Sequence, residues 1–297
     1  MRDYKQIIYE NPAPAVARIV MNRPEKLNAQ GNIMTYELDD AFKRACHDDS
    51  VNVIILAAAG AHFNAGHDLS GTEPLMPSEE ESRGLWGQYG APGWEGFYSR
   101  EKEMYLELTE RWRNASKPTI AQVHGAVVAG GIMLVWACDL IVCSEDARFK
   151  DNTAAELGVP GVEFFQHAFE VGVRRAKEWL FTGGWMDASE AERRGMVNRV
   201  VPRSELAERT LQLACEIAAN NRFAMKLVKE ALNKAQDLMG RKDAMDAAFS
   251  LHQIGHMQNM LIHGFPNDSS RLSPAVRAVL EKARAASAED GDRRQAL

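Results

Sequence analysis

The chain has 297 residues, of which 45% are hydrophobic and 26% charged, with a formal net charge of -6. This length suffices for one large core with an appendage or for two modest domains, and the composition is that of an ordinary soluble globular protein. The acidic balance argues against nucleic acid as a default partner, and the longest apolar run is far shorter than the ~20 residues of a membrane helix.

Cysteine usage and the N-terminal residues bear on the compartment. The four cysteines form no CxxC pair, and three of them lie in apolar segments: Cys46, Cys138, Cys143 and Cys215. We interpret them as buried thiols of a reducing, cytoplasmic compartment. Residues 1–10 are charged, so we expect no signal peptide. No cluster of zinc ligands is apparent in the sequence, so we expect no metal site.

Strands alternate with helices over the first half of the chain, which indicates an α/β layered fold. Residues 5–10 and 14–21 alternate or run apolar around a turn at Asn11-Pro12, as in a hairpin. Residues 32–47 carry apolar side chains at helical spacing. The further strands expected are 51–57, 119–123 and 139–144, and a further helix is expected at 98–114.

Residues 71–97 interrupt this pattern. The segment is rich in glycine and proline but also contains four aromatic residues, Trp86, Tyr89, Trp94 and Phe97. Long irregular segments are usually lids or disordered, and disordered segments seldom hold so many aromatic residues. The composition favours a mobile lid that contributes aromatic side chains to a ligand pocket over a plain surface excursion.

From residue 172 the chain is expected to be helical. Asp187 begins a helix-start signal and Gly195 provides a stop. Residues 274–297 are rich in Ala, Arg, Glu and Asp and fit either one charged helix or a frayed tail. We therefore divide the chain into a core at 1–202 and a C-terminal helical region at 203–297. The amphipathic helices expected in that region are 204–219, 224–239 and 242–263.

Two glycine-containing turns are the strongest functional signal. A buried helix is expected to open at Gly130-Gly131, and a small-residue turn, Ala65-Gly66-His67-Asp68, follows the strand at 51–57. Helices that begin on glycine expose backbone N–H groups that can hold an anion. If the two turns converge, they form an oxyanion hole. The alternative is a pair of tight turns with glycine chosen for backbone geometry.

These turns carry the motifs FNAGHDL and HGAVVAGG, which together resemble the crotonase (enoyl-CoA hydratase/isomerase) superfamily. The resemblance covers roughly residues 4–240. It implies a repeated ββα unit wound into a right-handed spiral, and C-terminal helices that pack a trimer or a dimer of trimers. Further matching motifs, in order, are NRPEKLNA, KPTIAQVHG, CDLIVCSEDARF, VRRAKEWLFTG, AERRGMVNRVVP and MKLVKEALNKA.

The resemblance also implies a substrate and its contacts. The superfamily binds acyl-CoA thioesters as substrates and stabilises a thioester enolate, and its two backbone donors match His67 and Gly130. The loop with Lys26 and Leu27 would fold over the CoA nucleotide; the alternative is a solvated turn. No separate cofactor is expected. The positions matched to acyl-CoA contacts are Lys26, Leu27, Ala29, Ala65, Gly66, His67, Asp68, Leu69 and Gly130.

The chain departs from the hydratase pattern at both acid/base positions. Met133 replaces the first glutamate, and Thr153, or Ala154 in another alignment, replaces the second. Hydration of a 2-enoyl-CoA through that pair is therefore not supported. The sequence leaves open an enzyme with relocated acid/base groups, which covers an unusual hydratase, an isomerase and a thioester hydrolase. It also leaves open a non-catalytic acyl-CoA-binding protein.

Other carboxylates are candidates for the missing proton-transfer group. Asp68 is interpreted as capping a turn, and Asp151 as pointing at backbone or solvent. Glu163 is expected at a helix start, where it shares a helix face with His167. Desolvated by neighbouring aromatic residues, Glu163 would serve as the acid/base group. The alternative is that Glu163 caps the helix and faces solvent.

Overall fold

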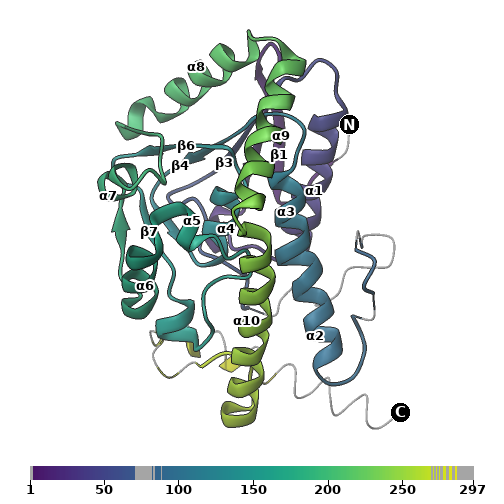
Figure 1. Ribbon diagram of the computed structural model, residues 1–297, viewed down its shortest axis with the longest axis vertical. Coiled ribbons are helices and arrows are strands. Elements are labelled where there is room, and N and C mark those ends of the chain that lie inside the picture. The colour runs from purple at the N-terminus through teal and green to yellow at the C-terminus, as the bar shows by residue number, and fades with distance from the viewer. Residues whose placement is uncertain are drawn as a thin grey trace.

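The computed structural model describes residues 3–70, 82, 84–87 and 89–268, and a few single positions up to residue 285. The expectations for most of residues 71–88 and for most of the tail at 274–297 lie outside the described residues. Among the described residues, no helix is long and apolar enough to cross a membrane. Figure 1 shows an α/β molecule in which helices cover a central sheet.

The central sheet has six strands in the order β1-β2-β3-β4-β6-β9. The first two form the antiparallel hairpin expected from the sequence, and the other neighbours pair in parallel. The strands predicted before residue 145 are therefore confirmed. Their bounds are β1 Ile7–Ala13, β2 Val16–Met21, β3 Val53–Ala58, β4 Thr119–Val123, β6 Leu140–Ser144 and β9 Arg199–Val201.

A second, three-stranded sheet in the order β5-β7-β8 was not predicted. Its strands have two or three residues each, too few to produce a periodic pattern: β5 Ala126–Val128, β7 Arg148–Lys150 and β8 Met186–Asp187. The chain twice passes from a central strand to a strand of this sheet and then into helical turns. This repetition is the ββα unit that the resemblance implied.

The helices agree with the expected ones except near residues 94 and 163. A helical stretch begins at Trp94, so Trp94 and Phe97 do not belong to an irregular lid, and that part of the expectation is wrong. The bounds are α1 Asn32–His47, α2 Trp94–Glu101, a π-helix at Lys102–Glu107, α3 Leu108–Arg113, α4 Gly130–Trp136, α5 His167–Val171, α6 Val173–Thr182, α7 Ala188–Arg193, α8 Leu206–Ala218, α9 Arg222–Leu238 and α10 Arg241–His263.

Strand β3 is buried on both faces, which explains its unbroken apolar run. Ile54 and Leu56 point into the main core, to which α1 and α4 contribute. Val53 and Ile55 point to the opposite face, where they pack with Leu206 and other residues of α8. Helix α8 lies across that side of the sheet in Figure 1. The end of β3 is thus held rigidly where the chain turns toward His67.

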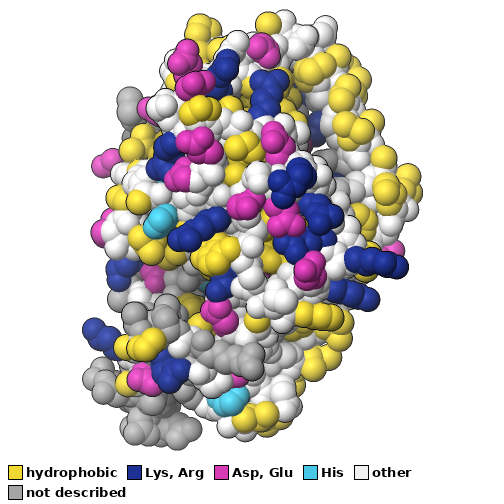
Figure 2. Space-filling view, turned by 90° about the vertical axis from the view of Figure 1, so that its left-hand side faces the viewer, with side chains coloured by type: hydrophobic (Ala, Val, Ile, Leu, Met, Phe, Trp, Pro, Cys, Tyr) yellow, Lys and Arg dark blue, Asp and Glu magenta, His cyan; other side chains and the backbone are white. Residues whose placement is uncertain are grey.

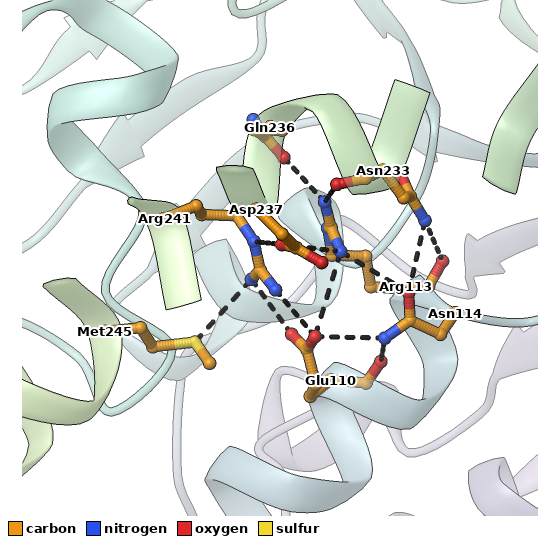
Figure 3. Close-up of polar contacts among 8 residues, drawn as sticks. All are labelled: Glu110, Arg113, Asn114, Asn233, Gln236, Asp237, Arg241 and Met245. Carbon is orange, nitrogen blue, oxygen red and sulfur yellow. Dashed lines mark hydrogen bonds and ion pairs between the residues drawn. The ribbon is translucent and has the colours of Figure 1, made fainter. Parts of the chain in front are cut away.

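Helices α9 and α10 run one after the other along the long axis, beside α3 (Figure 1). A polar network fixes this arrangement, and Figure 3 shows Arg241 at its centre. The Arg241 side chain is 0% exposed and donates to both carboxylate oxygens of Glu110, at 2.6 and 2.9 Å. Its Nε also donates to Asp237. Arg113 donates to the side chain of Gln236 on α9.

Replacing Arg241 by Met is expected to destabilise the protein by about 3 kcal/mol, because two carboxylates lose a buried partner. The value is at the low end for broken buried pairs, since the Glu110 and Asp237 side chains are 20% and 32% exposed. Urea denaturation measures the change. Arg209→Met, which breaks the exposed pair with Glu205, is the control and should cost under about 1 kcal/mol. Equal losses of stability in the two variants would contradict the stabilising role given to the buried Arg241 network.

Candidate active site

The first glycine turn follows β3 and leaves one backbone donor unused. Within the described residues, the His67 N–H has no hydrogen-bond acceptor. The neighbouring N–H groups all donate: Ala65 to the Leu27 carbonyl (3.1 Å), Gly66 to Asn64 Oδ1 (2.7 Å) and Asp68 to the Gln30 carbonyl (2.8 Å). The turn is therefore fixed on both sides of His67, and the His67 donor is held in a rigid frame.

The second turn joins β5 to α4 and has the same property. Ala129 has φ 44° and ψ −114°, a conformation that costs a non-glycine residue about 1–3 kcal/mol. Hydrogen bonds from the Ala129 N–H to the Lys150 carbonyl and from the Ile132 N–H to the Ala129 carbonyl hold it. Gly130 begins α4, and its N–H has no acceptor in the described part of the chain. Backbone strain of this kind clusters at functional sites.

The structure brings the two turns into contact. A Cβ added to Gly66 would lie 3.5 Å from the Gly130 nitrogen, and one added to Gly131 would lie 2.8 Å from the Asn64 carbonyl oxygen. The Val128 N–H donates to that same carbonyl, at 3.0 Å. Two unused N–H groups therefore belong to turns that touch, as an oxyanion hole requires. Their role as such a hole stays a prediction.

The His67 side chain lies between the second turn and Tyr105 of the π-helix. Its ring stacks on Tyr105 at a centroid distance of 3.6 Å, and a Cβ added to Gly130 would come within 2.5 Å of it. Burial lowers the pKa of His67 to about 3, so the imidazole is neutral at physiological pH. A side chain at residue 130 would meet this ring and would require the His67 side chain to move.

Glu163 is buried beside His67. Its side chain is 3% exposed, and Oε1 lies 3.7 Å from His67 Nδ1 and 3.7 Å from His252 Nε2. Burial, reinforced by the charge of Glu101, raises the pKa of Glu163 well above its ordinary value. The expected helix start is wrong, because α5 begins only at His167. The alternative, a helix cap that faces solvent, is also wrong.

Asp151 forms a separate buried pair and corrects a second expectation. Its Oδ2 lies 2.7 Å from His167 Nε2, and its Oδ1 accepts from the Thr153 hydroxyl, so it points at neither solvent nor backbone alone. Burial would raise the Asp151 pKa, but the hydrogen bonds from His167 and Thr153 outweigh it and lower the pKa. These bonds hold Asp151 and His167 together in the core, and a catalytic role of Asp151 stays a prediction. Met133, which stands at the position of the first hydratase glutamate, is buried in α4.

The loop expected near the CoA nucleotide lies against the first turn. Arg23 forms an ion pair of 2.7 Å with Asp68, which also accepts from the Ser70 N–H, so the interpretation of Asp68 as a turn cap is confirmed. Lys26 and Leu27 are exposed, and Leu27 has φ 52°, an uncommon value for leucine. The remaining matched positions, Ala29, Ala65 and Leu69, lie in the same two loops and are half-buried.

The sequence alone does not indicate three helical residues that lie near Glu163 or His67. Tyr105 stacks on His67, Glu101 is at the end of α2, and His252 is on α10. Single residues of these types on helices give no signal by themselves. The one usable signal was the spacing of His252 and His256, four residues apart on one helix face.

Comparison with known proteins adds the evolutionary context. The model of the family described as enoyl-CoA hydratase/isomerase matches residues 12–260. A Mycobacterium tuberculosis protein named as an enoyl-CoA hydratase, EchA13, is 44% identical over 262 residues, which cover 86% of this chain and 82% of that protein.

Two further relatives are named for different activities. The crystal structure of a probable enoyl-CoA hydratase from Mycobacterium smegmatis matches with a TM-score of 0.79 and 43% identity, covering 88% of this chain and 98% of that one. The 4-chlorobenzoyl coenzyme A dehalogenase-1 of an Arthrobacter species is 30% identical and covers 87% of this chain and 86% of its own length. Relatives of this chain are therefore named for different reactions.

Proposed function

The chain belongs to the enoyl-CoA hydratase/isomerase family and is an enzyme of hydratase-like type, and we propose that it transfers a proton on an acyl-CoA thioester through an enolate intermediate. The backbone N–H groups of His67 and Gly130 would hold the thioester oxygen as its negative charge develops. Such preorganised donors are worth most in a water-excluded site, where they need no reorganisation during the reaction.

The observation that carries the proposal is the position and pKa of Glu163. It is a buried carboxyl beside the ring of His67, which itself packs against Gly130. Its raised pKa makes its carboxylate a stronger base than an exposed one. Both neighbouring imidazoles are too far from Oε1 for a hydrogen bond, so neither ring engages that oxygen.

One carboxyl group favours a particular reaction class. Addition of water needs an acid and a base on one water molecule, and those positions hold Met133 and Thr153. The Thr153 hydroxyl is committed to Asp151, and Met133 has no proton to exchange. A single carboxylate can instead remove a proton beside the thioester carbonyl and return it to another acyl carbon. We therefore propose isomerisation of an acyl-CoA double bond rather than hydration.

The CoA nucleotide is proposed to lie beside Lys26 and Leu27. Both side chains are exposed on a loop that is hydrogen-bonded to the turn carrying His67. A lysine ammonium at this place can pair with a phosphate of CoA. The matched positions Ala29, Gly66 and Leu69 would line the path from the nucleotide to the thioester.

A panel of CoA thioesters tests the reaction. Saturated, 2-enoyl and 3-enoyl thioesters are incubated with the protein, and mass spectrometry with chromatography follows water addition, isomerisation and CoA release together. We expect isomerisation of at least one 3-enoyl thioester and a raised melting temperature with saturating acetoacetyl-CoA. A raised melting temperature without turnover of any thioester would instead support the non-catalytic acyl-CoA-binding alternative.

The region 203–297 is proposed to hold a trimer or a dimer of trimers together. Helices α9 and α10 expose many apolar side chains, and hydrophobic side chains gather along the right-hand edge of the molecule in Figure 2. Burying such a surface is the usual reason for self-association. The exposed apolar residues on these helices are Phe223, Leu227, Val228, Leu232, Leu238, Leu251, Ile254, Met257, Met260, Leu261 and Ile262.

Light scattering coupled to size-exclusion chromatography tests this assembly. We expect a mass three or six times the 33.0 kDa of the chain. Leu232→Glu, which places a charge on a side chain that is 66% exposed, is expected to shift the mass toward the monomer. Glu230→Gln, on the same helix, is the matched control and should leave the mass unchanged. A monomeric wild-type protein at working concentration would contradict the proposal.

A further inference from the structure

Two histidines and a glutamate meet between α2 and α10, next to Glu163. Glu101, His252 and His256 are 6%, 2% and 4% exposed. The Nε2 atoms of the two histidines are 2.8 Å apart. Carboxylate oxygens of Glu101 lie 3.5 Å from His256 Nε2 and 3.9 Å from His252 Nε2. These three side chains offer one ligand atom each to a common point.

The backbone fixes where the ring protons are. His252 Nδ1 lies 2.8 Å from the Gly161 carbonyl oxygen, and His256 Nδ1 lies 2.7 Å from the Pro266 carbonyl oxygen. A carbonyl oxygen only accepts, so each Nδ1 carries the proton. In a neutral imidazole the other nitrogen then has only a lone pair. Both Nε2 lone pairs therefore face each other beside a carboxylate, an arrangement that is stable only when the two nitrogens share a proton or bind a metal ion.

From this arrangement we infer that Glu101, His252 and His256 bind one divalent transition metal ion, with Zn²⁺ the best match. Two imidazoles and one carboxylate form the ligand set of a zinc site that keeps a fourth position open. Zinc–ligand bonds of about 2.0–2.1 Å place tetrahedral ligand atoms roughly 3.3 Å apart. The separation of 2.8 Å between the two Nε2 atoms and that of 3.5 Å between His256 Nε2 and Glu101 Oε1 lie on either side of that value, so small side-chain movements suffice.

The residues around these three side chains orient them as the outer hydrogen-bond partners of metal ligands do. Each histidine donates its second ring N–H to a backbone carbonyl, which fixes its tautomer and orientation. Glu101 is held by Gln253, whose side-chain amide donates to Oε2 at 2.7 Å. Gln253 in turn accepts from the Trp94 indole N–H at 3.1 Å. Each of the three proposed ligand side chains is therefore oriented by a further hydrogen bond.

The fourth position of this site would face Glu163, whose Oε1 is 3.7 Å from His252 Nε2. The metal would tie α10 to α2 and would set a positive charge beside the proposed acid/base group. This inference does not depend on the proposed reaction. The expectation of no metal site rested on spacing along the sequence, where Glu101 and His252 are too distant to read as one cluster.

Metal binding by the full-length, tag-free protein tests the inference. After treatment with a chelator, the protein is titrated with Zn²⁺ by calorimetry and with Co²⁺ by visible absorption. We expect one ion per chain and the absorption bands of a four-coordinate Co²⁺. His256→Ala should abolish those bands, and Glu101→Gln should weaken them. Gln253→Leu, which removes the support of Glu101, should weaken affinity by roughly 10–100-fold.

His263→Ala, on the same helix but away from the cluster, is the matched control and should bind as the parent does. Circular dichroism checks that each variant is folded. The wild-type titration is independent of any variant, so the inference can fail even if His256→Ala does not fold. No stoichiometric uptake by the wild type, or equal uptake by His256→Ala and His263→Ala, would overturn it. A proton shared between His252 and His256 in nitrogen NMR spectra, in the presence of excess Zn²⁺, would also overturn it.

Discussion

Replacing Glu163 by Gln is expected to lower turnover by about 10²–10⁴-fold while acyl-CoA binding persists, because the amide keeps shape and hydrogen bonding but cannot take a proton. The loss should appear in kcat rather than in the melting shift caused by acetoacetyl-CoA. Glu178→Gln is the matched control, since the Glu178 side chain is 65% exposed on α6. Full activity in Glu163→Gln would remove Glu163 from the mechanism.

The pH dependence of the activity of metal-free wild-type protein provides a second check on Glu163, because a cation bound by Glu101, His252 and His256 would itself lower the Glu163 pKa. Burial, followed by the charge of Glu101, raises its pKa, so much of the group is protonated at pH values where an exposed glutamate is ionised. A base must be ionised to act, and activity should therefore rise with pH through a pKa above 4.5. In Glu163→Gln this rise should be absent from the residual activity. Wild-type activity that falls over the same range would indicate an acid instead.

Replacing Gly130 by Pro is expected to lower turnover by about 10²–10³-fold, the usual effect of removing one donor from an oxyanion hole. Gly130 is the first residue of α4, a position where proline fits a helix and where its missing N–H breaks no helical hydrogen bond. Ala129, with ψ −114°, lies outside the extended range that a residue before proline adopts, so circular dichroism must first show that Gly130→Pro is folded. However, the new Cβ would also meet the His67 ring, at 2.5 Å.

Gly130→Ala separates these two effects, because alanine adds the same Cβ and keeps the N–H. We expect Gly130→Ala to lose activity through the displaced His67 ring, and Gly130→Pro to lose substantially more. Steady-state kinetics on the best thioester of the panel measures both. Equal losses in the two variants would mean that the Gly130 N–H makes no contribution.

Features encoded locally could be predicted from the sequence. The helix at 32–47 has a strong apolar period, and its observed bounds are the same. The helix opening at Gly130 was predicted from the glycine pair and the apolar run after it. Strand β3 was predicted from its unbroken apolar run. In these cases neighbouring residues contain the whole signal.

Features that depend on distant segments could not be predicted. The burial of Glu163 is created by α2 and α10, which approach it from about 60 to 90 residues away in the chain. The sequence around Glu163 resembles a helix start, yet the chain stays irregular until His167, whose ring pairs with the distant Asp151 in the core. The same distance in sequence hid the cluster of Glu101, His252 and His256.

The most direct test of the proposed chemistry is deuterium exchange into an acyl-CoA in D₂O, followed by mass spectrometry. Exchange beside the thioester carbonyl reports proton removal and an enolate, whatever the final product is. The account predicts that the wild type incorporates deuterium into a thioester that it binds, and that Glu163→Gln does so about 10²–10⁴-fold more slowly. A thioester that raises the melting temperature of the wild type but acquires no deuterium, across the whole panel, would contradict it.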